Sequence, residues 1–222
     1  MLLAIETAAE LVGVALAVDG EPYAGVWVRS ARRHAEALAP AIAHVLDQAG
    51  ATLADVETVA VDVGPGLFTG LRVGVATAQG LAQGLGVGVL GVASVDVLAR
   101  EAYDAGWRGP VAAVIDARRG EVFAATVDGP SGEVGPPARH RPAALAGTLR
   151  GTEGLLVVGS GAHRYAEAFA GLHVAAIREP SPRALAAAAA GKLARGARPV
   201  APADVRPVYL RDADARINWV QR

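Results

Sequence analysis

The stretch GPGLFTGLR, residues 64–72, separates an apolar run at 56–63 from a segment of helical character at 71–83. A glycine-rich turn from a buried strand into a helix can offer backbone N–H groups and the positive end of the helix dipole to an anion. The stretch lacks the Gly-Lys-Ser/Thr ending of a P-loop, so it does not predict an ordinary NTPase. A tight turn explains the glycines but neither Phe68 nor Arg72. The local order of strand, glycine loop and helix predicts an α/β protein.

The segments around this loop extend the same pattern through the first half of the chain. Asp19-Gly20 between two apolar runs is a strong hairpin signal, and apolar residues at three- and four-residue steps predict a helix that Gly50 ends. The strands are expected at 2–6, 12–18, 23–28, 56–63 and 87–92, and the helices at 33–48, 71–83 and 94–103, the last capped by Ser94. This order predicts a mixed sheet with helices packed on it.

The second half of the chain resembles the first half. Ala4-Ile5-Glu6 matches Val114-Ile115-Asp116, and Val18-Asp19-Gly20 matches Val127-Asp128-Gly129, at nearly one offset. This repetition indicates an internal duplication, so we expect an N-terminal lobe at 1–105 and a smaller, degenerate C-terminal lobe at 106–222. The second lobe is expected to contain a Gly/Pro-rich loop at 129–142, a strand at 155–158, helices at 162–170 and 182–195, the latter opened by Ser181, and a tail after Arg198 that packs back in extended form.

Composition excludes several classes of protein. The chain has 222 residues, 52% of them hydrophobic, no cysteine and a formal net charge of −1. The charge balance gives no global attraction for nucleic acid, and the lack of cysteine excludes a disulfide framework, thiolate catalysis and Cys-ligated zinc. No charged residue occurs from Val73 to Val95, but the glycines and glutamines there favour a buried helix and strand over a membrane span. No membrane association and a cytoplasmic location are expected.

Two of the expected helices carry signs of a partner surface. The helix at 71–83 contains Gly74 and Gly80, although each helical glycine costs up to about 1 kcal/mol relative to alanine. Close packing would offset that cost, against either a neighbouring helix of the same chain or another subunit. The helix at 33–48 has a second, weakly apolar face opposite its core stripe, which slightly favours another subunit. This face contains Ala37, Pro40, Ala41 and His44.

Other motifs are weaker. The sequence GVGVLG at 86–91 fits the dinucleotide-binding pattern, but it follows a helix and lies within the next strand, the reverse of the required order. His34 and His44 are about 15 Å apart along a helix, too far to share a metal ion. Leu38 occupies the position where an i+4 partner of His34 would stand. We find no complete catalytic constellation.

Five segments are recognisable together: LAIET at 3–7, HAE at 34–36, GPGLFTGLRVG at 64–74, DARRGEVF at 116–123 and PVYLR at 207–211. They resemble the bacterial TsaB family, formerly called YeaZ. The resemblance implies an α/β protein with the two-lobed actin/hexokinase/Hsp70-like (ASKHA) fold and ribonuclease-H-like mixed sheets, in agreement with the duplication.

The resemblance also implies a function. TsaB is similar to a degenerate copy of TsaD, the subunit that transfers threonylcarbamoyl to adenosine 37 of tRNAs reading ANN codons. TsaD holds its metal through a His-x-x-x-His pair, whose second position is here Leu38, so a non-catalytic subunit without a metal is expected. The implied role is to heterodimerise with TsaD through the helices at 33–48 and 71–83 and to support recruitment of the ATPase TsaE. tRNA would bind only through the complex, and a homodimer would form when TsaD is missing.

The resemblance assigns residues to these roles. No cofactor of the chain's own is expected, although the TsaD interface is a candidate nucleotide site. Glu6-Thr7-Ala8 stands where most relatives have Asp-Thr-Ser, which argues against independent ATP binding, and Leu67 stands where many have Ser. The expected partner interface comprises His34, Ala37, Leu38, Ala41, His44, Val45, Gly74, Val75, Ala78, Gln79 and Ala82; the glycine loop comprises Gly64, Pro65, Gly66, Phe68, Thr69, Gly70 and Arg72; and the candidate ligand-facing residues are Glu6, Thr7, Asp116 and Arg118.

Three alternatives stay open. One is an M22-type peptidase, against which the missing partner of His34 counts. Another is a small ATPase of the ASKHA fold, against which Glu6-Thr7-Ala8 counts. A third is a tRNA-binding module, although scattered arginines are more often solvated charges. Its phosphate track would comprise Arg195, Arg198, Arg206, Arg211 and Arg216.

Overall fold

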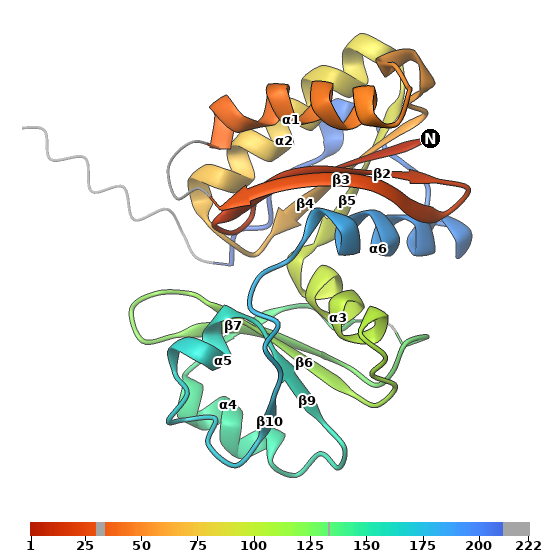
Figure 1. Ribbon diagram of the computed structural model, residues 1–222. Coiled ribbons are helices and arrows are strands. Elements are labelled where there is room, and N and C mark those ends of the chain that lie inside the picture. The colour runs from red at the N-terminus through yellow and green to blue at the C-terminus, as the bar shows by residue number, and fades with distance from the viewer. Residues whose placement is uncertain (30–33, 133, 211–222) are drawn as a thin grey trace, which may run out of the picture.

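The protein has two lobes, each built around one mixed sheet (Figure 1). The computed structural model describes residues 1–29, 34–132 and 134–210. The first sheet has the strand order β3-β2-β1-β4-β5, in which β1, β2 and β3 are antiparallel neighbours and β4 and β5 run parallel to β1. Its strands are β1 (Leu2–Glu6), β2 (Leu11–Val18), β3 (Glu21–Arg29), β4 (Thr58–Gly64) and β5 (Gly88–Ala93).

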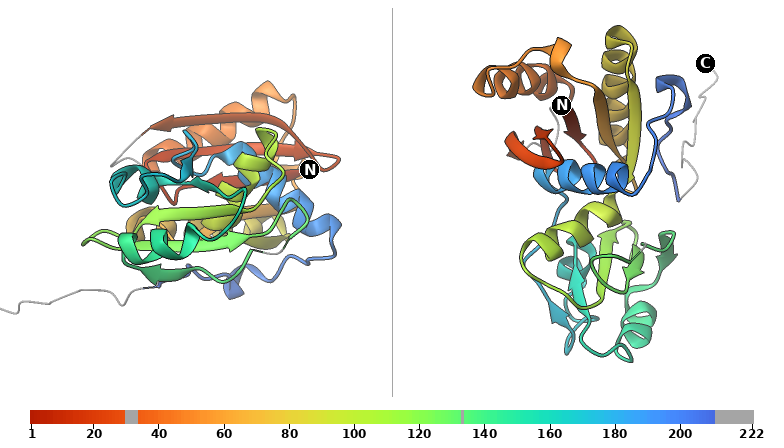
Figure 2. Two further views of the ribbon diagram at one scale, coloured as in Figure 1. Left: turned by 90° about the horizontal axis from the view of Figure 1, so that it is seen from below. Right: turned by 90° about the vertical axis from the view of Figure 1, so that its right-hand side faces the viewer.

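Helices cover both faces of the first sheet (Figure 2). On one face lie α1 (His34–Gln48) and α2 (Phe68–Leu85). A short 3-10 helix at Leu53–Asp55 connects α1 to β4, and the glycine loop connects β4 to α2. Leu38 of α1 and Val75 of α2 belong to the same core as Leu3 and Ile5 of β1. On the other face, α6 (Pro182–Ala194) packs its alanines against small residues of the sheet. Alternating residues of β1 therefore point into two different cores, as the pleat of a strand requires.

The second half repeats the first in element order and in strand pairing. Its sheet has the order β10-β9-β6-β7-β8, with β6, β7 and β8 antiparallel and β9 and β10 parallel to β6. This is the topology of the first sheet, so the duplication expected from the sequence is confirmed. The strands are β6 (Val111–Asp116), β7 (Val122–Val127), β8 (Ala138–His140), β9 (Leu156–Val158) and β10 (His173–Val174), and the helices are α4 (Pro142–Leu149) and α5 (Ser160–Arg164).

The last helix of each half packs on the sheet of the other half. α3 (Ser94–Asp104) contributes Val95, Leu98 and Ala102 to the core of the second sheet. α6, which follows β10, packs on the first sheet and also contacts α3. Both helices lie between the two sheets (Figure 1). The sequence analysis placed residues 182–210 with the second lobe, but by packing they belong with the first sheet.

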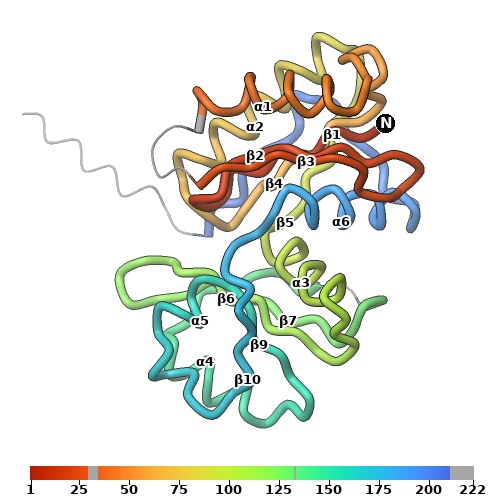
Figure 3. Tube along the Cα trace, in the orientation of Figure 1, coloured from red at the N-terminus to blue at the C-terminus, as the bar shows by residue number. Residues whose placement is uncertain are grey.

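The chain after α6 returns along the first lobe in extended form (Figure 3). Val89 of β5 and Val200 form an antiparallel bridge, and a 3-10 helix follows at Pro202–Asp204. The Val208 backbone N–H donates to the carbonyl of Val63 at 2.7 Å. The expected packing of the tail is therefore confirmed as far as Leu210.

The uncharged stretch 73–95 forms most of α2, then β5 and the start of α3. Gly86 ends α2 in the left-handed conformation, with φ of 70°. The sequence GVGVLG thus follows a helix and runs into a strand, as the sequence analysis expected. In the described part of the chain, none of the helices is long and apolar enough to cross a membrane.

Several expected elements differ from the structure. α2 begins at Phe68 instead of Leu71, and the helix expected at 162–170 ends as an α-helix at Arg164. The loop expected at 129–142 contains β8, and α4 and the two-residue β10 were not expected, because short apolar segments show little periodicity. Ser181 caps α6 by accepting the Ala184 N–H. Ser94 caps nothing, because its hydroxyl bonds a buried carboxylate instead.

Candidate functional site

A cleft of about 450 Å³ opens between the two lobes. The turn after β1 and the glycine loop line one side, and the other side is formed by the end of β6, by α5 and by the crossover that leads into α6. The carboxyl ends of β1, β4 and β6 point toward this cleft, which is where open α/β sheets place their ligands. Of the residues expected from the sequence, the cleft brings together Pro65, Gly66, Asp116 and Arg118.

The glycine loop is held closely against the turn after β1. The Leu67 N–H donates to the Ala8 carbonyl at 2.7 Å. A Cβ on Gly66 would overlap that same carbonyl, so the position requires glycine. One loop N–H is therefore consumed within the chain and is unavailable to an anion. Leu67, which the sequence left without an interpretation, stands at the N-cap of α2 and makes no side-chain cap hydrogen bond.

Phe68 and Arg72, which a simple turn did not explain, are not among the residues that line the cleft and instead contact each other and the tail. The Arg72 guanidinium lies 3.9 Å from the centre of the Phe68 ring, and its Nε donates to the Tyr209 hydroxyl at 3.1 Å. The Phe68 and Tyr209 rings are 5.0 Å apart. These three side chains therefore fasten the returning tail to the start of α2, with Phe68 and Tyr209 about two-fifths exposed.

Glu6 and Thr7, which the sequence placed facing a ligand, are both fully buried. The Thr7 hydroxyl donates to the Gly70 carbonyl at 2.9 Å, and Glu6 accepts the Ala8 N–H at 2.7 Å. Thr7 also fills the space where Gly74 would carry a Cβ. Gly74 is thus explained by packing inside the chain, with β1 approaching α2 too closely for any side chain.

A second buried acid, Asp62 at the end of β4, faces Glu6. Asp62 Oδ1 accepts the Ser94 hydroxyl at 2.6 Å and the Gly64 N–H at 2.7 Å. Among the described residues, no donor from another side chain or the backbone reaches Glu6 Oε2 or Asp62 Oδ2. Burial raises the pKa of Glu6 well above its ordinary value, and Asp62 raises it further; burial also raises the pKa of Asp62 to about 6. Burial and the proximity of the two acids therefore both favour the protonated form of a carboxyl at this pair.

Asp116 and Arg118 do face the cleft, in an ionic cluster. Asp116 Oδ2 lies 3.4 Å from Arg118 Nη1 and 3.3 Å from Arg164 Nε, and Asp116 Oδ1 accepts the Tyr165 hydroxyl. Across the cleft, Arg29 Nη1 donates to Glu179 Oε1 at 2.8 Å. Arg118 and Arg164 share the one carboxylate of Asp116, and Arg178 also lines the cleft, so its arginines outnumber its acids. Arg164, at the end of the short helix α5, and Glu179, in the segment before α6, were not expected at the cleft, because no local pattern marks either position.

Most of the residues expected at the partner interface are buried within the chain instead of lying exposed on α1 and α2. Six of those residues are buried in the core of the protomer, because the stripe of small residues on α2 packs on the first sheet. Ala37 and Ala41 are half-buried, His44 is exposed, and Gln79 donates to the Val205 carbonyl. The side chain of His34 lies outside the described residues. The six buried residues are Leu38, Val45, Gly74, Val75, Ala78 and Ala82.

The outward faces of α1 and α2 carry several small residues beside polar and charged ones such as Glu36, Asp47 and Arg72. Gly80 and Gly84 are exposed, and a Cβ on either would meet nothing within 4 Å. Unlike Gly74, these glycines are not required by packing within the chain. The two helices lie side by side on the same face of the sheet (Figure 1). Their other exposed residues include Ala39, Pro40, Ala43, His44, Ala76 and Gln83.

The described residues give little structural support to the catalytic and tRNA-binding alternatives. His163 Nε2 bonds the Ala175 carbonyl at 2.8 Å, and the nearby Ser160 hydroxyl accepts the Asp116 N–H, so they form no nucleophile–base pair. Within residues 1–29, 34–132 and 134–210, no group of three His, Asp or Glu side chains could hold a metal ion. Arg195, Arg198 and Arg206 are exposed, and Arg206 bonds the Val205 carbonyl; Arg211 and Arg216 lie outside the described residues.

A family model and several known sequences are similar to this chain. The family model described as "TsaD: tRNA N6-adenosine threonylcarbamoyltransferase" matches residues 20–135. The tRNA threonylcarbamoyladenosine biosynthesis protein TsaB of Escherichia coli is 38% identical over 122 residues, which are 55% of this chain and 52% of that protein. The match thus spans about half the length of that relative. An uncharacterized protein of Mycobacterium tuberculosis is 36% identical over 84% of this chain and 79% of its own.

Solved structures extend the likeness to nearly the whole chain. YeaZ from Pseudomonas aeruginosa superposes with a TM-score of 0.84 and 33% identity, covering 94% of this chain and 99% of that one. An inorganic polyphosphate/ATP-glucomannokinase from Arthrobacter reaches a TM-score of 0.50 at 15% identity, over 87% and 98% of the two chains, which concerns the fold alone. The expected actin/hexokinase/Hsp70-like fold is therefore confirmed.

Proposed function

Because the chain belongs to the TsaB (YeaZ) family, we propose that it is a non-catalytic subunit of the machinery that makes threonylcarbamoyladenosine in tRNA. In this role it heterodimerises with TsaD and supports recruitment of TsaE. The E. coli and Haemophilus influenzae relatives carry the name of this biosynthesis. tRNA is engaged only through the complex, and a homodimer forms on the same surface when TsaD is missing.

The observation that carries the proposal is the unfilled outer face of α1 and α2. A helical glycine is costly relative to alanine unless close packing offsets the cost, and among the described residues nothing lies within 4 Å of a Cβ built on Gly80 or Gly84. A face of small residues allows helices of another subunit to pack at short distance. We therefore propose the outward side of α1 and α2 as the interface, in place of the buried residues that the sequence analysis assigned to it.

The buried acid pair supports the non-catalytic part of the proposal. A working nucleotide site of this fold needs a carboxylate and a hydroxyl that reach the ligand. Here Glu6 and Thr7 are turned into the protein, and Ala8 offers no hydroxyl. We therefore expect no cofactor held by this chain alone, and any nucleotide would be held jointly at the interface with TsaD.

The test is assembly measured by size-exclusion chromatography with light scattering, on the chain alone, with TsaD, and with TsaD, TsaE and ATP. Gly80→Arg should block the complex with TsaD and abolish its tRNA threonylcarbamoylation, although the substitution favours the helix itself. The matched control is Gly147→Arg, at an exposed helical glycine of α4 with nothing within 4 Å. Equal assembly of both variants would refute the surface, and ATP or peptide hydrolysis by the chain alone would refute the non-catalytic role.

A further inference from the structure

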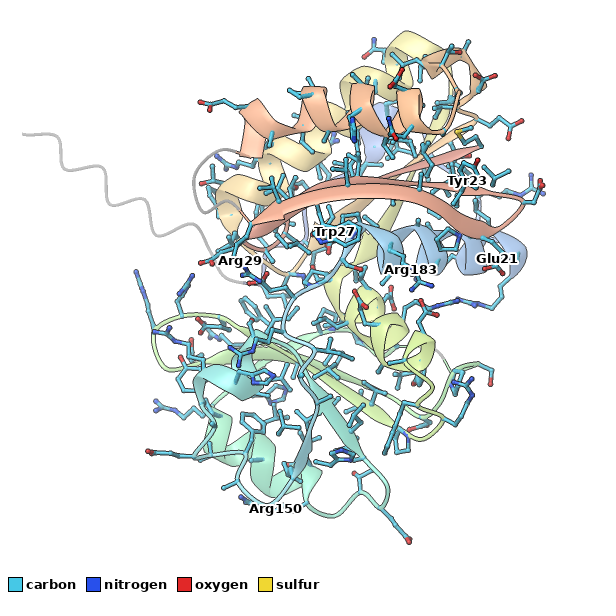
Figure 4. All side chains as sticks on the ribbon, in the orientation of Figure 1. Glu21, Tyr23, Trp27, Arg29, Arg150 and Arg183 are labelled. Carbon is cyan, nitrogen blue, oxygen red and sulfur yellow. The ribbon has the colours of Figure 1, made fainter. Side chains whose placement is uncertain are left out.

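A second hollow, of about 390 Å³, lies on the packed helices α3 and α6 and shares no lining residue with the cleft between the lobes. The two helices run antiparallel. Near one end of the pair, Lys192 Nζ lies 2.8 Å from Asp96 Oδ2. At the other end, Arg183 Nη1, labelled in Figure 4 at the junction of the lobes, lies 3.4 Å from Asp104 Oδ2. The hollow lies at the first of these ends, since Lys192 and Asp96 both line it.

Positive charge is in excess in this hollow. Its charged lining residues are Arg100, Lys192, Arg195 and one acid, Asp96. Asp96 is paired with Lys192, and Asp104 pairs with Arg100 Nε at 2.7 Å but is shared with a second arginine. Arg195 is exposed, and its side chain makes no ion pair or hydrogen bond with the described residues. The hollow therefore offers a guanidinium group that no carboxylate neutralises.

The two arginines of the hollow converge over Gly191 of α6. A Cβ built on Gly191 would lie 3.3 Å from Arg195 Nη1 and 3.8 Å from Arg100 Nη1. Apart from its chain neighbours and the backbone of α6, no other described atom lies within 4 Å of that position. The packing of α3 on α6 thus does not require the glycine, which leaves open the space between the two guanidinium groups. Like charges repel at this separation, and an anion held between them replaces the repulsion by attraction.

Tyr103 of α3 also lines the hollow, and its hydroxyl is buried without a hydrogen-bond partner among the described residues. Burial and the charge of Asp128 raise the pKa of this hydroxyl, so it keeps its proton at neutral pH. A buried hydroxyl without a partner lowers stability, and an acceptor brought into the hollow offers it one. Glu133 lies outside the described residues. The other lining residues are apolar or small: Pro130, Gly132, Val134, Ala188 and Ala197.

We propose that this hollow binds a phosphate group, either as the free ion or as part of a small phosphorylated molecule. Arg100 and Arg195 donate to the phosphate oxygens over Gly191, because the planar fork of a guanidinium suits phosphate. The volume is in the range of small-molecule sites, which are concave. An extended nucleic acid would instead need a basic track along the surface, and the net charge of the chain is −1.

A ligand at this place connects the two lobes. α3 packs on the second sheet and α6 on the first, so a phosphate held by Arg100 and Arg195 contacts the helices of both. A ligand that binds only the folded protein raises its stability, so phosphate should raise the Tm. The site lies apart from the outward faces of α1 and α2, and its test does not depend on assembly with TsaD.

Isothermal titration calorimetry tests the site, with inorganic phosphate and glycerol 3-phosphate as probes in chloride buffer of constant ionic strength. One saturable site is expected. Tighter binding of glycerol 3-phosphate identifies a phosphorylated molecule as the ligand, and equal or weaker binding identifies the free ion. Arg195→Gln should raise the Kd at least about tenfold, because a charged hydrogen-bond donor is lost. Arg198→Gln, at an exposed arginine outside the lining, is the matched control and should leave the Kd unchanged.

Gly191→Leu tests the same site without a change of charge. Leucine favours the helix and fills the space between the guanidinium groups, so phosphate binding should be lost. Gly147→Leu on α4 and Arg164→Gln in the cleft should bind phosphate as the unaltered chain does, and thermal melts check that each variant is folded. Absence of binding by both probes, with or without binding of tRNA, would overturn the proposal. Loss of binding in Arg164→Gln but not in Arg195→Gln would also overturn it.

Discussion

The carboxyl groups of Glu6 and Asp62 face each other at the ends of two adjacent parallel strands, with no solvent access to either. Asp62 is also tied to Ser94 at the start of α3, the helix that packs on the second sheet. Two like charges in a buried site cannot both ionise without a large desolvation cost. The pair is therefore connected through Ser94 to the helix at the junction between the lobes.

This pair predicts a specific pH dependence of stability. The pKa of Glu6 is well above its ordinary value, and burial raises that of Asp62 from 3.8 to about 6. The folded protein thus holds protons that the unfolded chain releases, so the free energy of unfolding falls as pH rises from about 4 through the raised pKa values. Glu6→Gln should remove much of this fall. Urea unfolding at pH 5 and pH 8 measures it.

The control for this experiment is Glu153→Gln, at an exposed acid in the second lobe. It should leave the difference in unfolding free energy between the two pH values as it is in the unaltered chain. If Glu6→Gln and Glu153→Gln change that difference equally, the acid pair does not govern it.

Two glycines of α2 should respond in opposite ways to the same substitution. Gly74→Ala forces a Cβ into Thr7 and should lower the free energy of unfolding by about 1–3 kcal/mol. Gly80→Ala meets nothing within 4 Å and should raise it by up to about 1 kcal/mol, because alanine favours the helix. Chemical denaturation of the two variants side by side measures both. The same sign for both would show that Gly74 is not in tight contact.

A similar contrast separates the buried and outward sides of the partner helices. Ala78 is fully buried, so Ala78→Arg places an unpaired guanidinium in the core and should abolish the native fold. Ala41 is half-buried on α1, and Ala41→Arg should fold, because the long side chain can extend its charge into water. Circular dichroism and solubility distinguish the two. A folded Ala78→Arg protein would contradict the packing of α2.

These cases show which features the sequence could predict. Periodicity and turn residues predicted most elements of the first lobe, and the matching Val-Asp-Gly segments predicted the repeated topology. The sequence analysis assigned Leu38, Val75 and Ala78 to a partner interface, but an apolar stripe does not say whether a sheet or another subunit covers it. The exchange of α3 and α6 between sheets depends on contacts far apart in the chain, for which no local pattern exists. Glu6 was misplaced for the same reason, since its partner Asp62 is distant in sequence.

The contact of Arg72 with Phe68 and Tyr209 should couple the tail to α2. Replacing Arg72 by alanine removes both the stacking on Phe68 and the hydrogen bond to the Tyr209 hydroxyl. In a double-mutant cycle with Tyr209→Ala, the two side chains should show a coupling energy of about 0.5–1.5 kcal/mol, the range for one hydrogen bond. Unfolding free energies of the single and double variants give this coupling. Strictly additive effects would mean that Tyr209 contributes nothing through Arg72 and that the tail is held by its other contacts, among them the Val208 backbone bond to Val63 and the Val89–Val200 bridge.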